Sequence, residues 1–157
     1  MAGVPALGGR ILFVGAALQP GELIGRKLGE FEVLELIGQG AFGMVFRAVQ
    51  SVLQRDAVVK IARFAGTEAA TSKAVAKFLA EARLASRIDH PFAAHVYAFG
   101  AEPDGLLWIA MEFVRGTPLE TLLEQQGPMP LERAVPLIRR LCEVVHQAHE
   151  QGIVHRD

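Results

Sequence analysis

The chain has 157 residues, of which 51% are hydrophobic and 21% charged, and its formal net charge at pH 7 is −1. These values are typical of a globular domain with a sizeable core, and the near-neutral charge argues against nucleic acid as a partner, because nucleic acid selects basic surfaces. A single cysteine, Cys142, excludes a disulfide framework or a thiolate metal site, which makes a reducing cytoplasm the expected compartment. Cys142 lies in an apolar helical pattern and is predicted to be a small core residue.

The N-terminal segment carries no clear structural signal. Residues 1–20 are rich in Gly, Ala and Pro, so residues 1–27 are predicted to form a flexible leader. The apolar run at residues 11–18 faintly resembles a signal peptide but lacks a small-x-small cleavage site. No stretch of the sequence reaches the roughly 18 apolar residues of a membrane span, and no membrane segment is therefore expected in this chain.

The next segments favour β-structure. Residues 31–37 and 45–49 are β-prone and flank a glycine cluster, a pattern that predicts two strands joined by a glycine-rich turn. A third strand is expected at residues 57–61, and its nearly continuous apolar character predicts burial on both faces. Two further strands, at 94–99 and 106–112, flank a Glu-Pro-Asp-Gly turn.

Helical periodicity appears in three places. Residues 71–87 form an amphipathic pattern, which the His90-Pro91 pair brings to an end. Thr117-Pro118-Leu119-Glu120 predicts a capping box with proline at the first helical position. A long helix is expected over residues 131–151, either beginning near Ala134 or kinked at Pro136, and ending at Gly152.

Three motifs carry candidate chemistry, and each is weak alone. Gly38-x-Gly40-x-x-Gly43 also occurs in dinucleotide-binding turns, but here it leads from strand to strand, as in a hairpin whose backbone N–H groups can approach a triphosphate. The second motif is Lys60, whose charge inside an apolar strand needs a partner, either Glu81 or a phosphate. The alternative for Lys60 is a place at a sheet edge, from which it reaches solvent. The alternative for Glu81 is a solvent-exposed helix face. The third motif is the terminal His155-Arg156-Asp157.

In this order, and with Met111-Glu112-Phe113-Val114 after a strand, the motifs resemble the eukaryotic-type (Hanks-type) protein kinases, most closely their bacterial serine/threonine branch. The resemblance implies an α+β kinase-like fold. Residues 28–114 would form the N-lobe, an antiparallel β-sheet with one αC-type helix and the hinge. Residues 115–157 would form the first helices of a truncated C-lobe.

The resemblance also implies ATP as cofactor and a role for each matching residue. Lys60 would bind the α- and β-phosphates, Glu81 would pair with Lys60, and Asp157 would accept the proton of the substrate hydroxyl. The remaining ATP contacts would come from the glycine-rich segment, from Val58 (where the family usually has alanine), from the gatekeeper Met111 and from the hinge, together Ile37, Gly38, Gln39, Gly40, Ala41, Phe42, Gly43, Val45, Val58, Met111, Glu112, Phe113 and Val114.

The resemblance further implies Mg²⁺ and a protein substrate, but the sequence to Asp157 contains no Asp-Phe-Gly and no catalytic-loop asparagine to hold the metal. No metal ligands are therefore predicted, and the chain by itself is expected to be inactive. The exposed stripe Leu137, Ile138, Leu141 and Val145 would mark a partner site or an aggregation hazard. A non-catalytic nucleotide-binding or protein-interaction small lobe, and an aminoglycoside-type phosphotransferase, are the alternatives.

Overall fold

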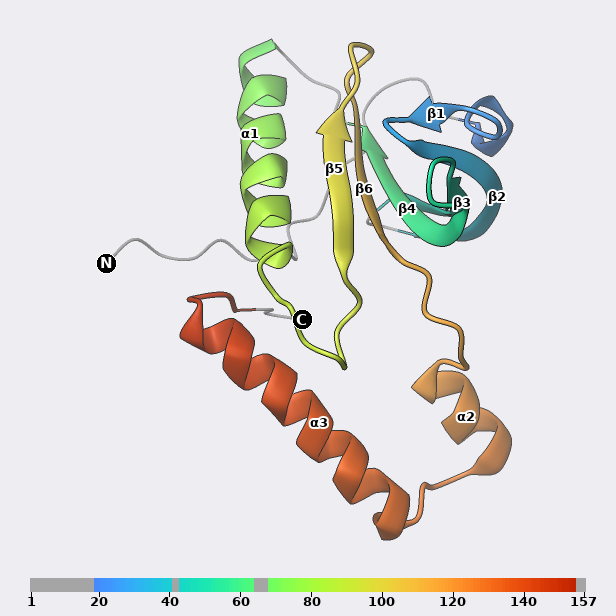
Figure 1. The fold of residues 1–157 in the computed structure, drawn as a ribbon, viewed down its shortest axis with the longest axis vertical. Helices are drawn as coiled ribbons and strands as arrows, with labels where there is room; N and C mark the ends of the chain where they lie inside the picture. The colour runs from blue at the N-terminus through green and yellow to red at the C-terminus, as the bar shows by residue number, and fades with distance from the viewer. Residues whose placement is uncertain (1–18, 41–42, 64–67, 155–157) are drawn as a thin grey trace.

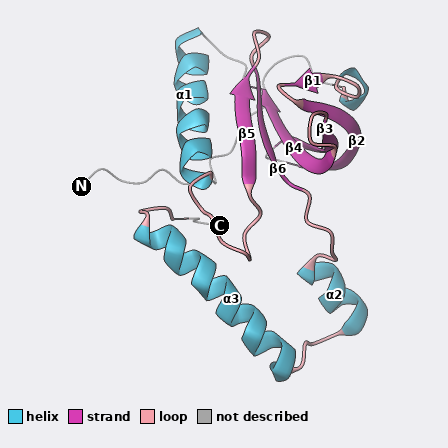
Figure 2. Cartoon of the chain, in the orientation of Figure 1, coloured by secondary structure: helices cyan, strands magenta, loops and turns pink. Residues whose placement is uncertain are grey.

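A six-stranded antiparallel sheet with one helix beside it and two helices below it makes up the fold (Figures 1 and 2). The structure is a computed structural model and describes residues 19–40, 43–63 and 68–154. The strand order is β1-β2-β3-β4-β6-β5. The elements are a 3-10 turn Pro20–Glu22, β1 Lys27–Leu28, β2 Phe31–Gly40, β3 Gly43–Gln50, β4 Arg55–Arg63, α1 Glu68–Ala85, β5 Val96–Ala101, β6 Leu106–Glu112, α2 Leu119–Gln126 and α3 Leu131–Glu150.

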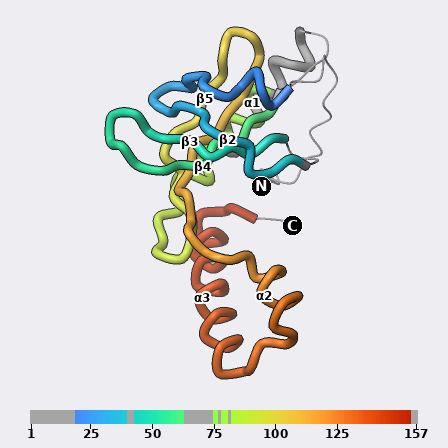
Figure 3. The backbone as a smooth tube through the Cα atoms, turned by 90° about the vertical axis from the view of Figure 1, so that its right-hand side faces the viewer, coloured from blue at the N-terminus to red at the C-terminus, as the bar shows by residue number. Residues whose placement is uncertain are grey.

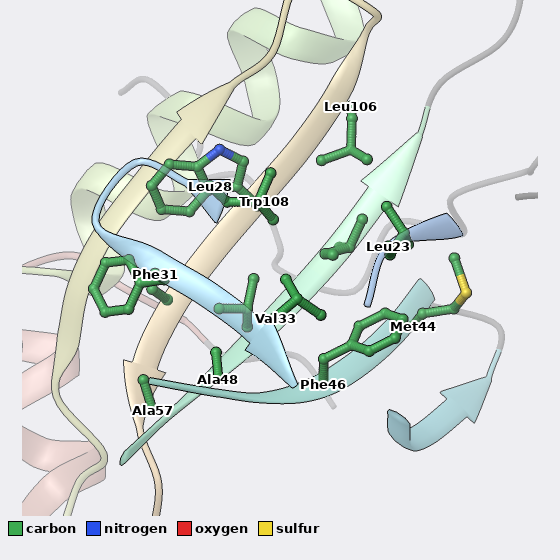
Figure 4. Close-up of a cluster of buried hydrophobic side chains, with 13 residues drawn as sticks. Leu23, Leu28, Phe31, Val33, Met44, Phe46, Ala48, Ala57, Leu106 and Trp108 are labelled. Atoms are coloured by element: carbon green, nitrogen blue, oxygen red, sulfur yellow. The ribbon is translucent and has the colours of Figure 1, made fainter. Parts of the chain in front are cut away.

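The hydrophobic core lies on one face of the curved sheet, because apolar residues alternate along its strands with less buried ones. Figure 4 shows these side chains converging from β2, β3, β4 and β6. Phe46 and Phe31 are the largest fully buried side chains among the described residues. The cluster consists of Leu23, Leu28, Phe31, Val33, Met44, Phe46, Ala48, Ala57, Val59, Ile61, Leu106, Trp108 and Ala110.

Residues 19–27 do not behave as the flexible leader that the sequence predicts. Leu23 is fully buried in the core cluster. The backbone N–H of Gly25 donates to the carbonyl of Val33 at 2.7 Å, and the N–H of Val33 donates to the carbonyl of Arg26 at 3.0 Å. The sequence does not predict this order, because a single buried leucine gives no periodic pattern and backbone hydrogen bonds leave no trace in the choice of side chains. Residues 1–18 lie outside the described part of the chain.

The expectation that β4 is buried on both faces is half wrong. Ala57, Val59 and Ile61 are fully buried, whereas Val58 and Lys60 between them are only partly buried. β4 is nevertheless an interior strand, paired with β3 on one side and β6 on the other. Lys60 is therefore not the edge residue that the alternative interpretation required.

The five predicted strands and three predicted helices are present; β6 has the predicted bounds, and the ends of other elements are shifted. The first helix is α1, which begins three residues earlier than predicted and ends two residues earlier, and β5 begins at Val96 rather than Ala94. Figure 1 shows α1 alongside β5. Of the described helices, none has both the length and the apolar character that crossing a membrane requires.

The predicted capping box at the start of α2 is wrong. Pro118 is the N-cap, with φ −53° and ψ 142°, and no side chain caps the helix. Proline therefore stands one position before the first helical residue, Leu119. The fixed φ of proline suits both the N-cap position and the first helical position. The sequence Thr117-Pro118-Leu119-Glu120 therefore does not show which of the two Pro118 occupies.

The helix α3 begins at Leu131 and continues through Pro136. Pro136 has no N–H and leaves the carbonyl of Glu132 without its helical donor. At the other end Gly152 has φ +73°, and the N–H of Ile153 donates to the carbonyl of Ala148 at 2.8 Å, as in a Schellman motif. The prediction that Gly152 ends the helix is confirmed.

One face of α3 is exposed, as the apolar stripe predicts. Leu137, Ile138, Leu141 and Val145 are 42%, 57%, 61% and 38% exposed. Cys142 is exposed as well, so its predicted place in a core is wrong. Figures 1 and 3 show why: α2 and α3 lie apart from the sheet, below it in both views.

Candidate nucleotide site

The glycine motif lies at the tip of the β2–β3 hairpin, as predicted. Gly38 pairs with Val45, Gln39 with Met44, and Gly40 with Gly43. Gly43 has φ +122°, a backbone conformation that side chains rarely allow, which explains the third glycine. Ile37 lies at the same end of β2 and is 48% exposed. Ala41 and Phe42, both predicted to contact ATP, lie outside the described residues.

Strand register places four of the other predicted ATP contacts on one face of the sheet. Val45 pairs with Lys60, and Val58 pairs with Met111. Directly paired residues project to the same face, as do residues two apart on one strand. All four are partly buried, whereas their neighbours along the strands, such as Val59, are fully buried. The candidate site is therefore the half-buried face, opposite the core.

Lys60 lies in the interior strand β4, and Glu81 lies in α1, near the C-terminal end of the helix. The helix contacts β5 and β6, so both residues belong to the same part of the molecule. The side chain of Glu81 lies outside the described part of the chain. The predicted ion pair between Lys60 and Glu81 therefore stays a prediction.

The segment after β6 leaves its backbone polar groups available. Met111 and Glu112 end the strand, and Phe113 and Val114 follow it. Within the described residues, no backbone hydrogen bond involves residues 113–117. Such a segment can present N–H and C=O groups to the edge of a planar base, as the predicted hinge requires.

Charged side chains from distant parts of the chain hold this segment, and the sequence motifs predict none of these contacts. Asp56 accepts hydrogen bonds from Nη2 of Arg115 at 2.6 Å and from Nη2 and Nε of Arg47 at 3.0 and 3.3 Å. The hydrogen bonds from Arg47, and then the one from Arg115, hold the pKa of the Asp56 carboxyl below its usual value. Strand alternation was the available signal, since Arg47 is two residues from Val45 and Asp56 two from Val58.

His95 contacts the first hinge residue from the other side. Its Nδ1 lies 3.0 Å from Oε2 of Glu112, and its Nε2 lies 3.0 Å from Oδ1 of Asp89. A neutral imidazole has one N–H, so it can donate to only one of the two carboxylates, whereas the imidazolium donates to both. The hydrogen bonds that His95 donates, first to Glu112 and then to Asp89, raise the pKa of His95 above its usual value.

We expect His95 to stabilise the fold at acidic pH and to lose this effect as the pH rises. A group whose pKa is higher in the folded state contributes fully below its unfolded pKa, about 6.5 for histidine, and loses the contribution through its folded pKa. The difference between the unfolding temperatures of the unchanged chain and of His95→Gln should therefore shrink as the pH is raised from below about 6.5. The matched control is His146→Gln, since Nε2 of His146 faces a single carboxylate, that of Glu150, at 3.5 Å. A difference that stays unchanged as the pH is raised would contradict the prediction.

Other predicted features of the site lie beyond the structural description. Asp157, the predicted proton acceptor, is outside the described residues, as are His155 and Arg156. Among the residues that are described, no three His, Cys, Asp or Glu side chains are arranged to hold a metal ion.

Comparison with known proteins identifies related sequences and folds. The family model "Protein kinase domain" matches residues 31–157. The serine/threonine-protein kinase pkn3 of Myxococcus xanthus is 37% identical over 87% of this chain, and PrkC of Bacillus subtilis is 33% identical over 86%. The match spans only 25% of pkn3 and 20% of PrkC. The solved PknI kinase domain of Mycobacterium tuberculosis superposes with a TM-score of 0.71 at 25% identity, over 90% of this chain and 54% of that one.

Proposed function

This chain belongs to the protein kinase domain family, and we propose that it is part of a bacterial-type serine/threonine kinase, which transfers the γ-phosphate of ATP to Ser or Thr of a protein. The proposal rests on one observation. Val45, Lys60, Val58 and Met111 share a half-buried face, which connects the glycine hairpin to the segment after Glu112 that forms no backbone hydrogen bond with the described residues. Relatives that match most of this chain are named serine/threonine-protein kinases, which supports the same activity.

Within this proposal each group supplies position or charge, which is most of what phosphoryl transfer requires. Residues 37–45 cover the phosphates with backbone N–H groups, and Lys60, held by Glu81, contacts the α- and β-phosphates. Val58 and Met111 bound the adenine, whose edge is read by the backbone of residues 112–114. Asp157 accepts the proton of the attacking hydroxyl.

Magnesium does not fit the residues that are present. Mg²⁺ neutralises charge on the phosphates in this family, but the sequence contains no Asp-Phe-Gly and no asparagine. We therefore expect the 157-residue chain to bind ATP without transferring its γ-phosphate. The division into a small lobe at 28–114 and the first helices of a large lobe at 115–157 belongs to the same proposal.

We also propose ATP and a protein substrate as partners, without nucleic acid, and a cytoplasmic location. The near-neutral charge and the single cysteine support the last two points.

Nucleotide binding by the purified chain tests the proposal. Titration with ATP should show saturable binding that GTP does not match, because the hinge backbone would read the edge of adenine. Incubation with radiolabelled ATP, Mg²⁺ and a generic basic protein substrate should give no labelled protein. Absence of ATP binding would contradict the proposed site, and transfer that depends on Lys60 would contradict the expected inactivity.

A further inference from the structure

The hinge segment is held to the sheet by side chains rather than by its own backbone. Residues 113–117 form no backbone hydrogen bond with any described residue, and a reader of the adenine edge has to keep those groups free. A segment without a backbone ladder has no fixed register of its own. Its position must then come from side-chain contacts.

Asp56 makes the contact that joins the hinge to the strands. It lies at the start of β4, 59 residues before Arg115, and accepts the short 2.6 Å hydrogen bond from Nη2 of that residue. The same carboxylate accepts two hydrogen bonds from Arg47 on β3. The side chain of Asp56 is only 20% exposed, whereas that of Arg115 is 80% exposed. The surrounding sheet therefore restrains the Asp56 carboxylate, and the carboxylate in turn restrains the Arg115 side chain.

Arg47 adds a second contact between the sheet and the hinge. Its guanidinium lies 5.9 Å from the centroid of the Phe113 ring, within the range of a cation–π interaction. Its Nη1 also donates to Oε1 of Glu35 on β2 at 3.1 Å. Asp56 and Glu35 thus orient Arg47 from two strands, while Arg47 covers the first residue after the strand end at Glu112.

We infer that Asp56 is a positioning residue for adenine recognition: through Arg115 and Arg47 it fixes the hinge backbone where the base is read. The inference rests on the proposed nucleotide site and adds residues that the family motifs do not include. Asp56 need not touch ATP for this role. Its loss would leave the glycine hairpin and Lys60, which contact the phosphates, unchanged.

The test uses two probes that separate base from phosphate. In calorimetric titrations of the 157-residue chain, Asp56→Asn should weaken ATP binding by about threefold to tenfold and leave the affinity for inorganic tripolyphosphate unchanged. Asp56→Glu keeps the carboxylate and should recover most of the loss. The matched control is Glu143→Gln, which breaks the Arg139–Glu143 pair at 3.2 Å on α3 and should change neither affinity.

The possible outcomes distinguish this inference from the proposed site. Equal loss for ATP and tripolyphosphate would show a general structural role for Asp56 and overturn the inference, as would an unchanged ATP affinity. A chain that binds neither probe before any substitution would overturn the nucleotide site itself, and the inference with it. Unfolding temperatures of all variants, measured alongside, identify any that fails to fold. If Asp56→Asn fails to fold, the same two titrations are made with Arg115→Gln, which should weaken ATP binding alone if the inference holds and should leave ATP binding unchanged if it is wrong.

Discussion

Lys60→Met is expected to weaken ATP binding by about tenfold to a hundredfold. Lys60 lies on the half-buried face of the interior strand β4. It pairs directly with Val45 on β3, and Val58, two residues before it, pairs with Met111 on β6. A charge-assisted hydrogen bond to phosphate in such a place is worth about 1.5–3 kcal/mol, which sets the expected factor.

Methionine has a similar length and no charge, so it keeps the packing of the aliphatic part of Lys60 while removing the group that would contact phosphate. Lys27→Met is the matched control, since Lys27 is an exposed lysine on the short strand β1. Both variants would be titrated with ATP and unfolded thermally. An ATP affinity for Lys60→Met equal to that of the unchanged chain would contradict the assignment of Lys60 to the phosphates.

Lys60 also shows how much of the site the sequence could provide. Its place in an apolar run predicts a strand, and the glycine cluster between two β-prone runs predicts the hairpin, because both signals are local. The prediction that this strand is buried on both faces is wrong, since Val58 and Lys60 are partly buried. Ligand-binding surfaces and protein cores are both rich in apolar residues, so an apolar strand sequence does not show which of its faces packs in the core and which lines a binding site.

The charged contacts around the hinge could not be predicted in the same way. Asp56 and Arg115 are 59 residues apart, and His95 and Glu112 are 17 apart. Their meeting depends on the register of β4 and β5 against β6, and a shift of one residue would turn each of these side chains to the other face. Local pattern leaves that register open, so the family motifs include the phosphate contacts and omit the groups that hold the hinge.

Gly100→Ala is expected to destabilise the fold by about 1–3 kcal/mol, although the same substitution is usually mild or favourable in a strand. Gly100 pairs directly with Trp108 across β5 and β6. A Cβ atom at Gly100 would lie 2.7 and 2.8 Å from the Cζ2 and Cε2 atoms of the indole. Either the ring or the strand must move.

The indole has little freedom to give way. Trp108 Nε1 donates to Oε1 of Glu102 at 2.8 Å. A Cβ atom at Gly29 would lie 3.0 Å from Cη2, so the ring also packs closely against a second glycine. The Phe31 ring is tilted against it, with centroids 6.1 Å apart. Displacing the indole would therefore break the Glu102 hydrogen bond or shift β5 away from β6.

A double-mutant cycle separates this clash from a general intolerance of alanine. Thermal unfolding should show a loss of roughly 3–10 °C for Gly100→Ala. In a Trp108→Leu background the same change should cost almost nothing, because the atoms that it strikes are gone. Gly38→Ala is the matched control on β2: its Cβ would lie 3.8 Å from Cβ of Val45, ordinary packing distance, so stability should be unchanged or slightly higher. An equal cost with and without the indole would mean that the contact between Gly100 and Trp108 does not determine the effect, and that the backbone of β5 itself rejects a side chain at this position.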